Sequence, residues 1–168
     1  GAYTVKLEAP IISAVSINAT ASIDIKGILK PVTNLLHLSA PSVKTEGIVA
    51  NGQNGSLLPL LPATAPTAGG TVFIQSDSFD ADSPAGATAI SADGGNAALT
   101  SLHQGGDGGT IHIGSDAKPI AGDVMIKKAI SASSGANATI LQHGGKGGTV
   151  CVVSGGRIDV RAGIKVSE

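Results

Sequence analysis

Charged residues of both signs recur at one position of a repeated strand, and this pattern could do chemistry. The position is held by Asp24, Lys44 and Asp80, and then by Met125 and Asp159. If the strands stack in register, these side chains share one outward face. Two carboxylates about 9.6 Å apart with a lysine between them could serve a polysaccharide lyase or an inverting glycosidase. The simpler interpretation is that Lys44 neutralises its neighbours, since no aromatic platform for sugar rings accompanies the charges.

Histidines form the second group that could hold a ligand. His103 and His143 stand just before two glycine-rich segments, and His112 follows the first of these. Three imidazoles can bind zinc, but these have no acidic residue at ligand spacing. The metal site is therefore only an alternative prediction, and no metal and no cofactor are expected.

One outward column of the repeat is expected to contain His37, Phe73, His112 and Cys151. Phe73 would separate the two histidines by two strands, too far for a shared metal. The chain has a single cysteine, which cannot form an internal disulfide, and its place within a strand favours a structural role.

The glycine-rich segment 105–109 (GGDGG) resembles two ligand-binding motifs only superficially. Its aspartate is not at the ligand position of calcium-binding nonapeptides, and Lys146 replaces it in the next copy. It is not a phosphate loop either, because no Lys-Ser/Thr ending follows and a strand comes next.

The elements that must position these residues belong to a repeat. Residues 105–113 (GGDGGTIHI) recur thirty-nine positions later as 144–152 (GGKGGTVCV), and a shorter copy, 69–74 (GGTVFI), lies thirty-nine positions earlier. Two further strands follow each copy, and all of them alternate apolar and polar residues. The pattern predicts an all-β fold, a parallel β-helix (solenoid) of about six three-stranded coils.

Apolar residues at equivalent strand positions should form inward columns. The expected first-strand columns are Val5/Leu36/Val72/Ile111/Val150 and Leu7/Leu38/Ile74/Ile113/Val152, the second-strand column is Ile23/Val43/Phe79/Val124/Ile158, and the third is Ile28/Ile48/Ile90/Ile130/Ile164.

A single domain, 1–168, is expected, with coils at about 1–15, 16–34, 35–55, 69–97, 108–138 and 147–168. Long excursions, 52–66, 97–104 and 138–143, should leave from one corner and lie side by side. Asn54, Asn96 and Asn137 recur just after the third strand, and they predict a structural turn ladder of stacked asparagines. Asn18, Asn54 and Asn137 also begin glycosylation sequons, for which the ladder is the preferred interpretation.

Composition narrows the classes of function. Apolar residues make up 42% of the chain and charged residues 14%, and the formal charge is −1. This balance gives no reason to expect nucleic acid as a partner. No apolar run reaches the length of a membrane span, so membrane insertion is not expected.

The repeat resembles the coils of filamentous-haemagglutinin-type exoproteins and related right-handed β-helix adhesins. The shared register is Gly-Gly-Thr-Val/Ile-X-Ile/Val, then Ile-X-Val, then Gly-Ile-X-Ala-X-Gly, and residues 38–52 (LSAPSVKTEGIVANG) are the closest single coil. The resemblance covers nearly the whole chain. It implies a passenger or filament-forming solenoid that is extracellular or at the cell surface.

The leading hypothesis is a non-enzymatic structural or adhesive solenoid that associates with itself or with neighbouring coils of a longer chain. The last strand carries no cap, which leaves Ile164 and Val166 at an open edge. A leucine-rich excursion offers a second surface for self-association, formed by Leu57, Leu58, Leu60 and Leu61. The alternative is a polysaccharide-binding or polysaccharide-cleaving protein that uses Asp24, Lys44 and Asp80. Surface glycans would then be a further partner.

Overall fold

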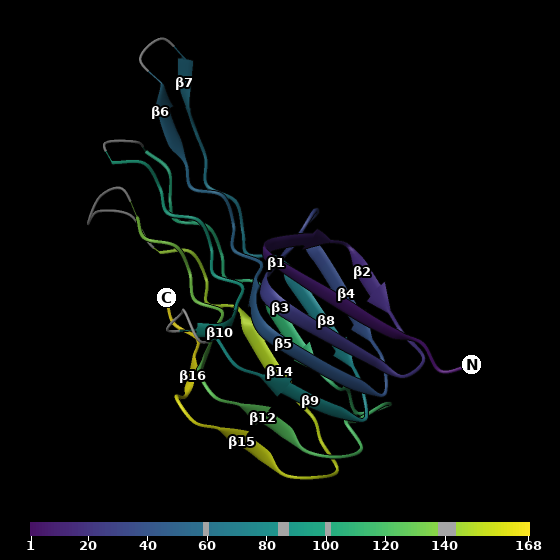
Figure 1. Ribbon diagram of the computed structural model, residues 1–168. Coiled ribbons are helices and arrows are strands. Elements are labelled where there is room, and N and C mark those ends of the chain that lie inside the picture. The colour runs from purple at the N-terminus through teal and green to yellow at the C-terminus, as the bar shows by residue number, and fades with distance from the viewer. Residues whose placement is uncertain (59–60, 84–87, 100–101, 138–143) are drawn as a thin grey trace.

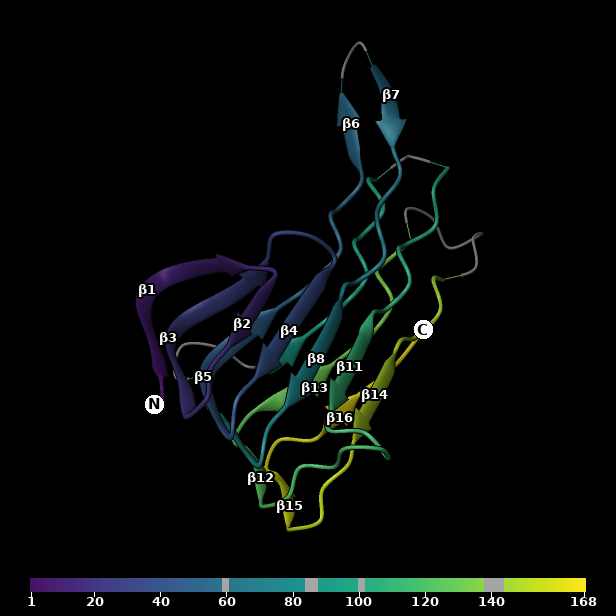
Figure 2. The same cartoon turned by 90° about the vertical axis from the view of Figure 1, so that its right-hand side faces the viewer.

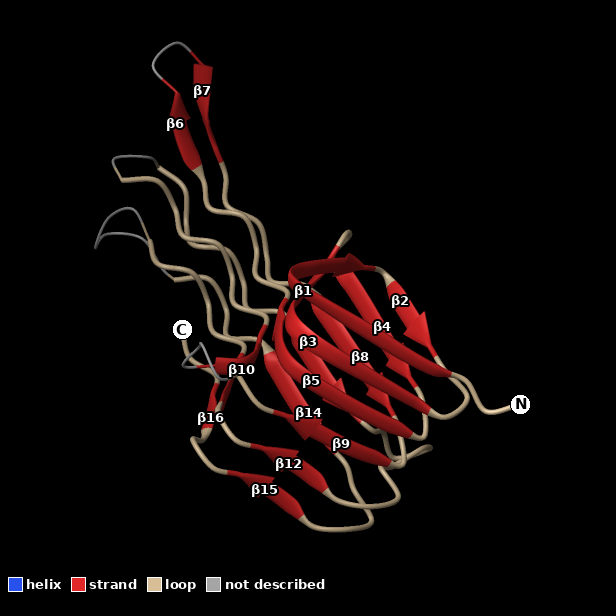
Figure 3. Cartoon of the chain, viewed as in Figure 1, coloured by secondary structure: helices blue, strands red, loops and turns tan. Residues whose placement is uncertain are grey.

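Two parallel β-sheets make up most of the chain. The structure is a computed structural model, and it describes residues 1–58, 61–83, 88–99, 102–137 and 144–168. Within these ranges every regular element is a strand (Figure 3), and none is a helix long and apolar enough to cross a membrane. The prediction of an all-β protein with parallel sheets is confirmed.

The larger sheet has nine strands, all paired in parallel. Its path runs β15-β12-β9-β5-β10-β13-β16, and β3 and then β1 stack on β5. The strand β5 is shared, because its first half pairs with β9 and its second half with β10. The bounds are β1 Thr4–Ala14, β3 Ser22–Pro31, β5 Ser42–Val49, β9 Ser78–Ala81, β10 Thr88–Ser91, β12 Val124–Ile126, β13 Ala129–Ser131, β15 Ile158–Val160 and β16 Ile164–Lys165.

The smaller parallel sheet has five strands in the order β14-β11-β8-β4-β2. Their bounds are β2 Ser16–Asn18, β4 Leu35–Ser39, β8 Thr71–Gln75, β11 Thr110–Ile113 and β14 Thr149–Val152. A separate antiparallel pair, β6 (Ser56–Leu58) and β7 (Leu61–Thr64), stands away from both sheets (Figure 1).

The core lies between the two sheets, which face each other in Figures 1 and 2. In most strands of the two sheets alternate residues point inward, as the period of two requires, and the buried apolar side chains form one continuous cluster. Phe79 is the largest fully buried side chain. The isoleucine and leucine side chains of this cluster that are less than 2% exposed are Ile23, Ile25, Leu29, Leu36, Leu38, Ile48, Ile74, Ile90, Ile111, Ile113, Ile120, Ile126 and Ile130.

Near the N-terminus the strands differ from the expected three per turn. The predicted second and third strands are continuous there, because β1, β3 and β5 each run through the corner. At that corner Gly27 has a φ of 117°, which favours glycine, and its N–H donates to Glu46 Oε2 at 2.6 Å. The strand register shifts on both sides of β3 at this point, so the corner is a bulge and not a break.

Three residues do not lie in the inward columns that the sequence predicts for them. Val5 and Leu7 pair with Ile23 and Ile25, and so belong to the nine-stranded sheet and not to the first-strand columns. Ile28 is 37% exposed, because the bulge at Gly27 moves the inward position to the next residue. That residue, Leu29, pairs with Ile48 and takes the inward place.

Candidate functional site

The charged face lies on the outer side of the nine-stranded sheet, in the expected register. Asp24 pairs with Lys44, Lys44 with Asp80, and Asp80 with Met125, which precedes Asp159. Lys44 therefore stands between the two carboxylates, which are two strand spacings apart, about 9.6 Å. This alternation of charge suits mutual neutralisation along a ladder. Cleavage of a polysaccharide at this face stays a prediction.

A neighbouring column on the same face also pairs opposite charges. Lys127 Nζ lies 3.0 Å from Asp82 Oδ2. The hydrogen bond from Lys127 to Asp82 raises the pKa of the lysine above 10.5, and the charges of Asp80 and Asp82 act in the same direction. Lys26 and Glu8 form a looser pair at 3.7 Å. The positive charge of Lys127 thus offsets the acidic end of this face.

The column of ring-bearing residues lies on the outer side of the five-stranded sheet. His37 pairs with Phe73, Phe73 with His112, and His112 with Cys151. The Phe73 and His112 rings are stacked, with centroids 5.0 Å apart and planes at 7°. The two histidines are separated by Phe73, as expected.

The histidines of the alternative metal site lie on different elements. His103 Nε2 is 3.2 Å from the Ala63 carbonyl oxygen in the first excursion, whereas His112 lies in β11. His143 is outside the described residues. Among the residues that are described, no group of three His, Cys, Asp or Glu side chains is arranged to hold a metal ion.

The three excursions form an organised layer, in which their described parts lie side by side as expected but are joined by contacts that the sequence did not predict. Each excursion begins and ends closer to the sheets than its predicted bounds. At that point a glycine N–H of the returning segment donates to a carbonyl oxygen of the outgoing segment. Gly70 donates to Ala50 at 2.6 Å, and equivalent bonds run from Gly109 to Ala92 at 2.6 Å and from Gly148 to Ala132 at 2.7 Å. The paired segments then extend side by side (Figures 1 and 2). We call this array the wing, and its described parts are 50–58 with 61–70, 92–99 with 102–109, and 132–137 with 144–148.

Backbone contacts between glycines hold the wing together. Gly95 N–H donates to Thr67 O at 2.9 Å, Gly106 N–H to Gly95 O at 2.8 Å, and Gly135 N–H to Gly106 O at 2.8 Å. A Cβ at Gly95 would clash with the Gln53 carbonyl, and one at Gly135 would clash with Gly95. The segments approach one another so closely that only glycine fits between them, as at the axis of the collagen triple helix.

Asparagines connect successive excursions, but with one change from the predicted ladder. Asn96 N–H donates to Asn54 Oδ1 at 2.8 Å, and Ala136 N–H donates to Asn96 Oδ1 at 2.7 Å. The third position is therefore Ala136, and Asn137 lies one residue further along. Asn137 Oδ1 instead accepts the Gly105 N–H at 2.8 Å and so joins an outgoing segment to a returning one.

A second ladder lies three residues closer to the sheets and was not predicted. Asp93 N–H donates to Asn51 Oδ1 at 2.9 Å, and Ser133 N–H donates to Asp93 Oδ1 at 2.8 Å. Ser131 Oγ also donates to Asp93 Oδ1, at 2.5 Å. The residue type changes from asparagine to aspartate to serine along this ladder, so no repeated letter marks it in the sequence, although polar side chains after a strand could have suggested turns.

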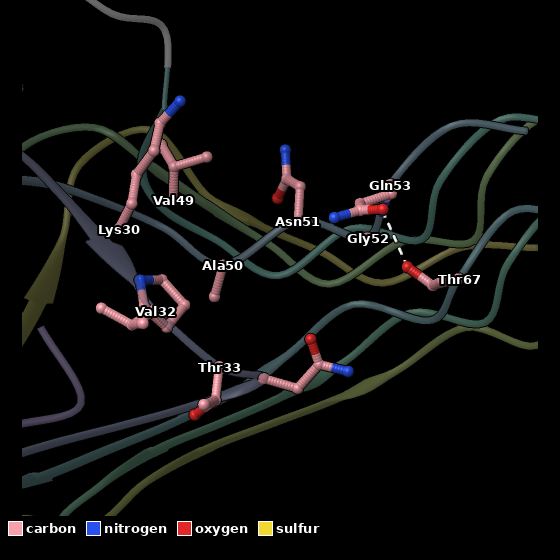
Figure 4. Close-up of a pocket in the computed structure, with 11 residues that line it drawn as sticks. Lys30, Val32, Thr33, Val49, Ala50, Asn51, Gly52, Gln53 and Thr67 are labelled. Carbon is pink, nitrogen blue, oxygen red and sulfur yellow. Dashed lines mark hydrogen bonds between the residues drawn. The ribbon is translucent and has the colours of Figure 1, made fainter. Parts of the chain in front are cut away.

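Two polar cavities lie at the base of the wing. The first, of about 440 Å³, is lined by residues 30–34 and 49–53 and by Thr67, whose Oγ1 accepts the Gln53 N–H at 2.8 Å (Figure 4). The second, of about 500 Å³, opens beside the two ladders and is lined by Asn51, Asn54, Asp93, Asn96, Ser133 and Lys165 among others. Asn51 and Gly52 line both.

The predicted self-association residues lie at two separate places. Ile164 is 52% exposed and Val166 46%, at the edge of the nine-stranded sheet. Leu57 is 49% exposed in β6. Leu60 lies outside the described residues. Leu58 ends β6 and Leu61 begins β7, and the structure describes only the backbone of these two residues.

Comparison with known proteins gives this chain no relative. No family model, no curated protein and no solved structure matches it.

Proposed function

We propose that the two parallel sheets are the faces of a β-helix, and that the protein is a structural or adhesive element outside the cell that associates with itself. The strand register supports the helix, because β8, β11 and β14 pair in order, as do β9, β12 and β15. The resemblance of the repeat to exoprotein coils supports the location.

The observation that carries self-association is the apolar edge formed by β15 and β16. Ile158 and Ile164 continue the buried columns of Val124 and Ile130, which are 0% exposed. Ile158 itself is 45% exposed and Ile164 52%. A strand edge that carries exposed core residues favours pairing with another strand.

We propose a second copy as the occupant of this edge, through its strand β1. The columns that end in Ile158, Val160 and Ile164 begin in Val5, Leu7 and Ile12, which are only partly buried. A second copy stacked head to tail would therefore continue each column in the same parallel register.

The charges on the outer side of these strands fit the same register. Pairing Ile158 with Val5 of the second copy sets Asp159 opposite Lys6 and Arg161 opposite Glu8. A slip by two residues would set Asp159 opposite Glu8, two like charges. The charges therefore favour one register over its neighbours.

The contact would be carried by the nine-stranded sheet alone. The contact joins β15 and β16 to β1 of the next copy, and these three strands all belong to that sheet. In the five-stranded sheet, β14 of one copy and β2 of the next copy would consequently lie two strand positions apart. We expect the association to be weak and to depend on protein concentration.

Sedimentation velocity over a range of concentrations tests the proposal. We expect the wild-type chain to form larger species at high concentration and Ile164→Asp to remain monomeric, because a carboxylate would interrupt the apolar column. Val32→Asp is the matched control, since Val32 is 65% exposed and lies outside both edges. A wild-type chain that stays monomeric throughout, or an Ile164→Asp chain that associates equally well, would contradict the proposal.

A charge exchange tests the register separately. Lys6→Asp and Asp159→Lys should each weaken association about tenfold, since each replaces the opposite pair between copies by a like pair. Asp159→Lys also removes the pairs of Asp159 with Arg157 and Arg161 of its own chain. Mixing the two variants should restore association, because the aspartate introduced at position 6 of one chain can then face the lysine introduced at position 159 of the other. Equal association of each variant alone and of the mixture would reject the register while leaving self-association intact.

A further inference from the structure

We propose that the second cavity, the amide cleft, binds an uncharged oligosaccharide. The amide cleft is the cavity of about 500 Å³ in the angle between the wing and the nine-stranded sheet. The polar or charged side chains that line it include Asn51, Asn54, Asp93, Asn96, Ser133 and Lys165. Lys165 belongs to β16 and so joins this cleft to the edge proposed for self-association, but the amides that carry the inference lie on the wing.

The asparagine amides of the cleft are fixed in orientation. Asn54 Oδ1 accepts the backbone N–H of Asn96, and Asn51 Oδ1 accepts that of Asp93. An amide whose oxygen is held in this way presents its Nδ2 group on the opposite side. The Nδ2 groups of Asn51, Asn54 and Asn96 have no hydrogen-bond partner within the described part of the chain. They are donors available to a ligand.

Repetition of the wing turns these donors into a row. Asn54 and Asn96 occupy the same place in successive excursions, so their amides are separated by about one strand spacing, roughly 4.8 Å. The ladders hold the row in place before any ligand arrives, which lowers the entropic cost of binding. A chain molecule with repeated hydroxyl groups could bond to several of these amides at once.

The charges of the cleft favour an uncharged ligand. Asp93 and Lys165 carry the only formal charges among its lining residues in the described part of the chain, and they have opposite signs. The second carboxylate oxygen of Asp93 adds an acceptor to the amide donors, whereas the Ser133 hydroxyl already accepts from Ser167 Oγ at 3.2 Å. Donors and acceptors side by side, with no net charge, match the hydroxyl groups of a neutral sugar.

An extended peptide is a poorer fit for this cleft. The backbone N–H groups next to the ladders are already bonded, from Gly52 to Asp93 O at 2.8 Å, from Gly94 to Ser133 O at 2.8 Å, and from Ser134 to Ser167 O at 2.9 Å. A peptide that adds as a strand needs free backbone groups. The groups that remain free belong to side chains, so the cleft suits a ligand that is bound through hydroxyls.

Isothermal titration of the full chain with maltohexaose, cellohexaose and chitohexaose tests the inference. We expect at least one to bind, and Asn54→Asp and Asn96→Asp each to weaken that binding about tenfold. Either change keeps the Oδ1 that accepts the next backbone N–H but replaces the Nδ2 donor by an oxygen. Circular dichroism and thermal melting should show that the variants remain folded.

Asn18→Asp is the matched control, because Asn18 lies on β2, away from the cleft. It should bind the oligosaccharide as the wild type does. The inference is overturned if none of the three sugars binds, or if Asn54→Asp and Asn96→Asp bind as tightly as the wild type. Displacement of the sugar by a glycine-rich peptide, or a clear preference for a sulfated glycan, would also overturn the assignment to neutral sugars. None of these outcomes bears on sedimentation, so self-association is judged separately.

Discussion

Phe79→Ala should lower the free energy of unfolding by about 4 kcal/mol. Phe79 is 1% exposed and is the largest side chain of the core. It lies in β9 between Val43 of β5 and Val124 of β12, so neighbours on both sides enclose it. Truncation would leave a cavity that the hydrogen-bonded sheets cannot close, because their spacing is fixed.

Urea denaturation followed by circular dichroism measures this effect, and the chain supplies its own control. Phe73 is the other phenylalanine, and it is 38% exposed on the outer side of the five-stranded sheet. Phe73→Ala should cost about 1 kcal/mol, mainly through its stacking with His112. Similar losses of stability for the two variants would show that Phe79 is not enclosed between the two sheets.

Gly95→Ala should destabilise the protein by about 3 kcal/mol, although it adds a single methyl group. The new Cβ would meet the carbonyl of Gln53, and the backbone of Asn54 lies just beyond it. The Gln53 carbonyl cannot move easily, because it accepts the Thr67 N–H at 3.0 Å, and Gly95 is itself bonded to Thr67 and Gly106. The clash is between main chains, so no side-chain rotation can relieve it.

Gly47→Ala is the control for this substitution. Gly47 lies in β5 without a positive φ, and a Cβ there would have its nearest neighbour, Ser83 Oγ, at 3.7 Å. That variant should be neutral or slightly stabilised, since alanine reduces the entropy of the unfolded chain. Thermal unfolding of both variants tests the contrast. Equal stability of Gly95→Ala and the wild type would mean that the segments of the wing are not in close contact.

The parts of the fold that could be predicted are those where side chains alternate regularly. The sequence 110–113 and its copy 149–152 differ in most residues, yet they pair residue by residue as their alternation indicates. The charged ladder through Lys44 followed from the same period. A single glycine was enough to break the prediction at Ile28, because the bulge at Gly27 changes which side of the strand faces inward.

The sequence predicted excursions that lie side by side, but the contacts that hold the wing together could not be predicted, because main-chain atoms make them. Glycine has no side chain to show a period, so segments such as 105–109 indicate flexibility or a turn when they are considered singly. Their packing depends on other segments far away in the sequence, as the contact of Gly135 with Gly95 shows. The amide cleft was missed for the same reason, since the wing forms one of its walls.

The main-chain contacts between glycines in the described part of the wing give the protein two parts with different responses to temperature. Burial of Ile and Leu between the sheets carries a large heat-capacity change and loses strength on cooling. Exposure of peptide groups changes the heat capacity in the opposite sense, so the hydrogen-bonded glycine layers have no such loss. In the cold the wing should therefore keep its cohesion while the apolar core weakens, and the part that looks least like a folded domain would be the one least sensitive to low temperature.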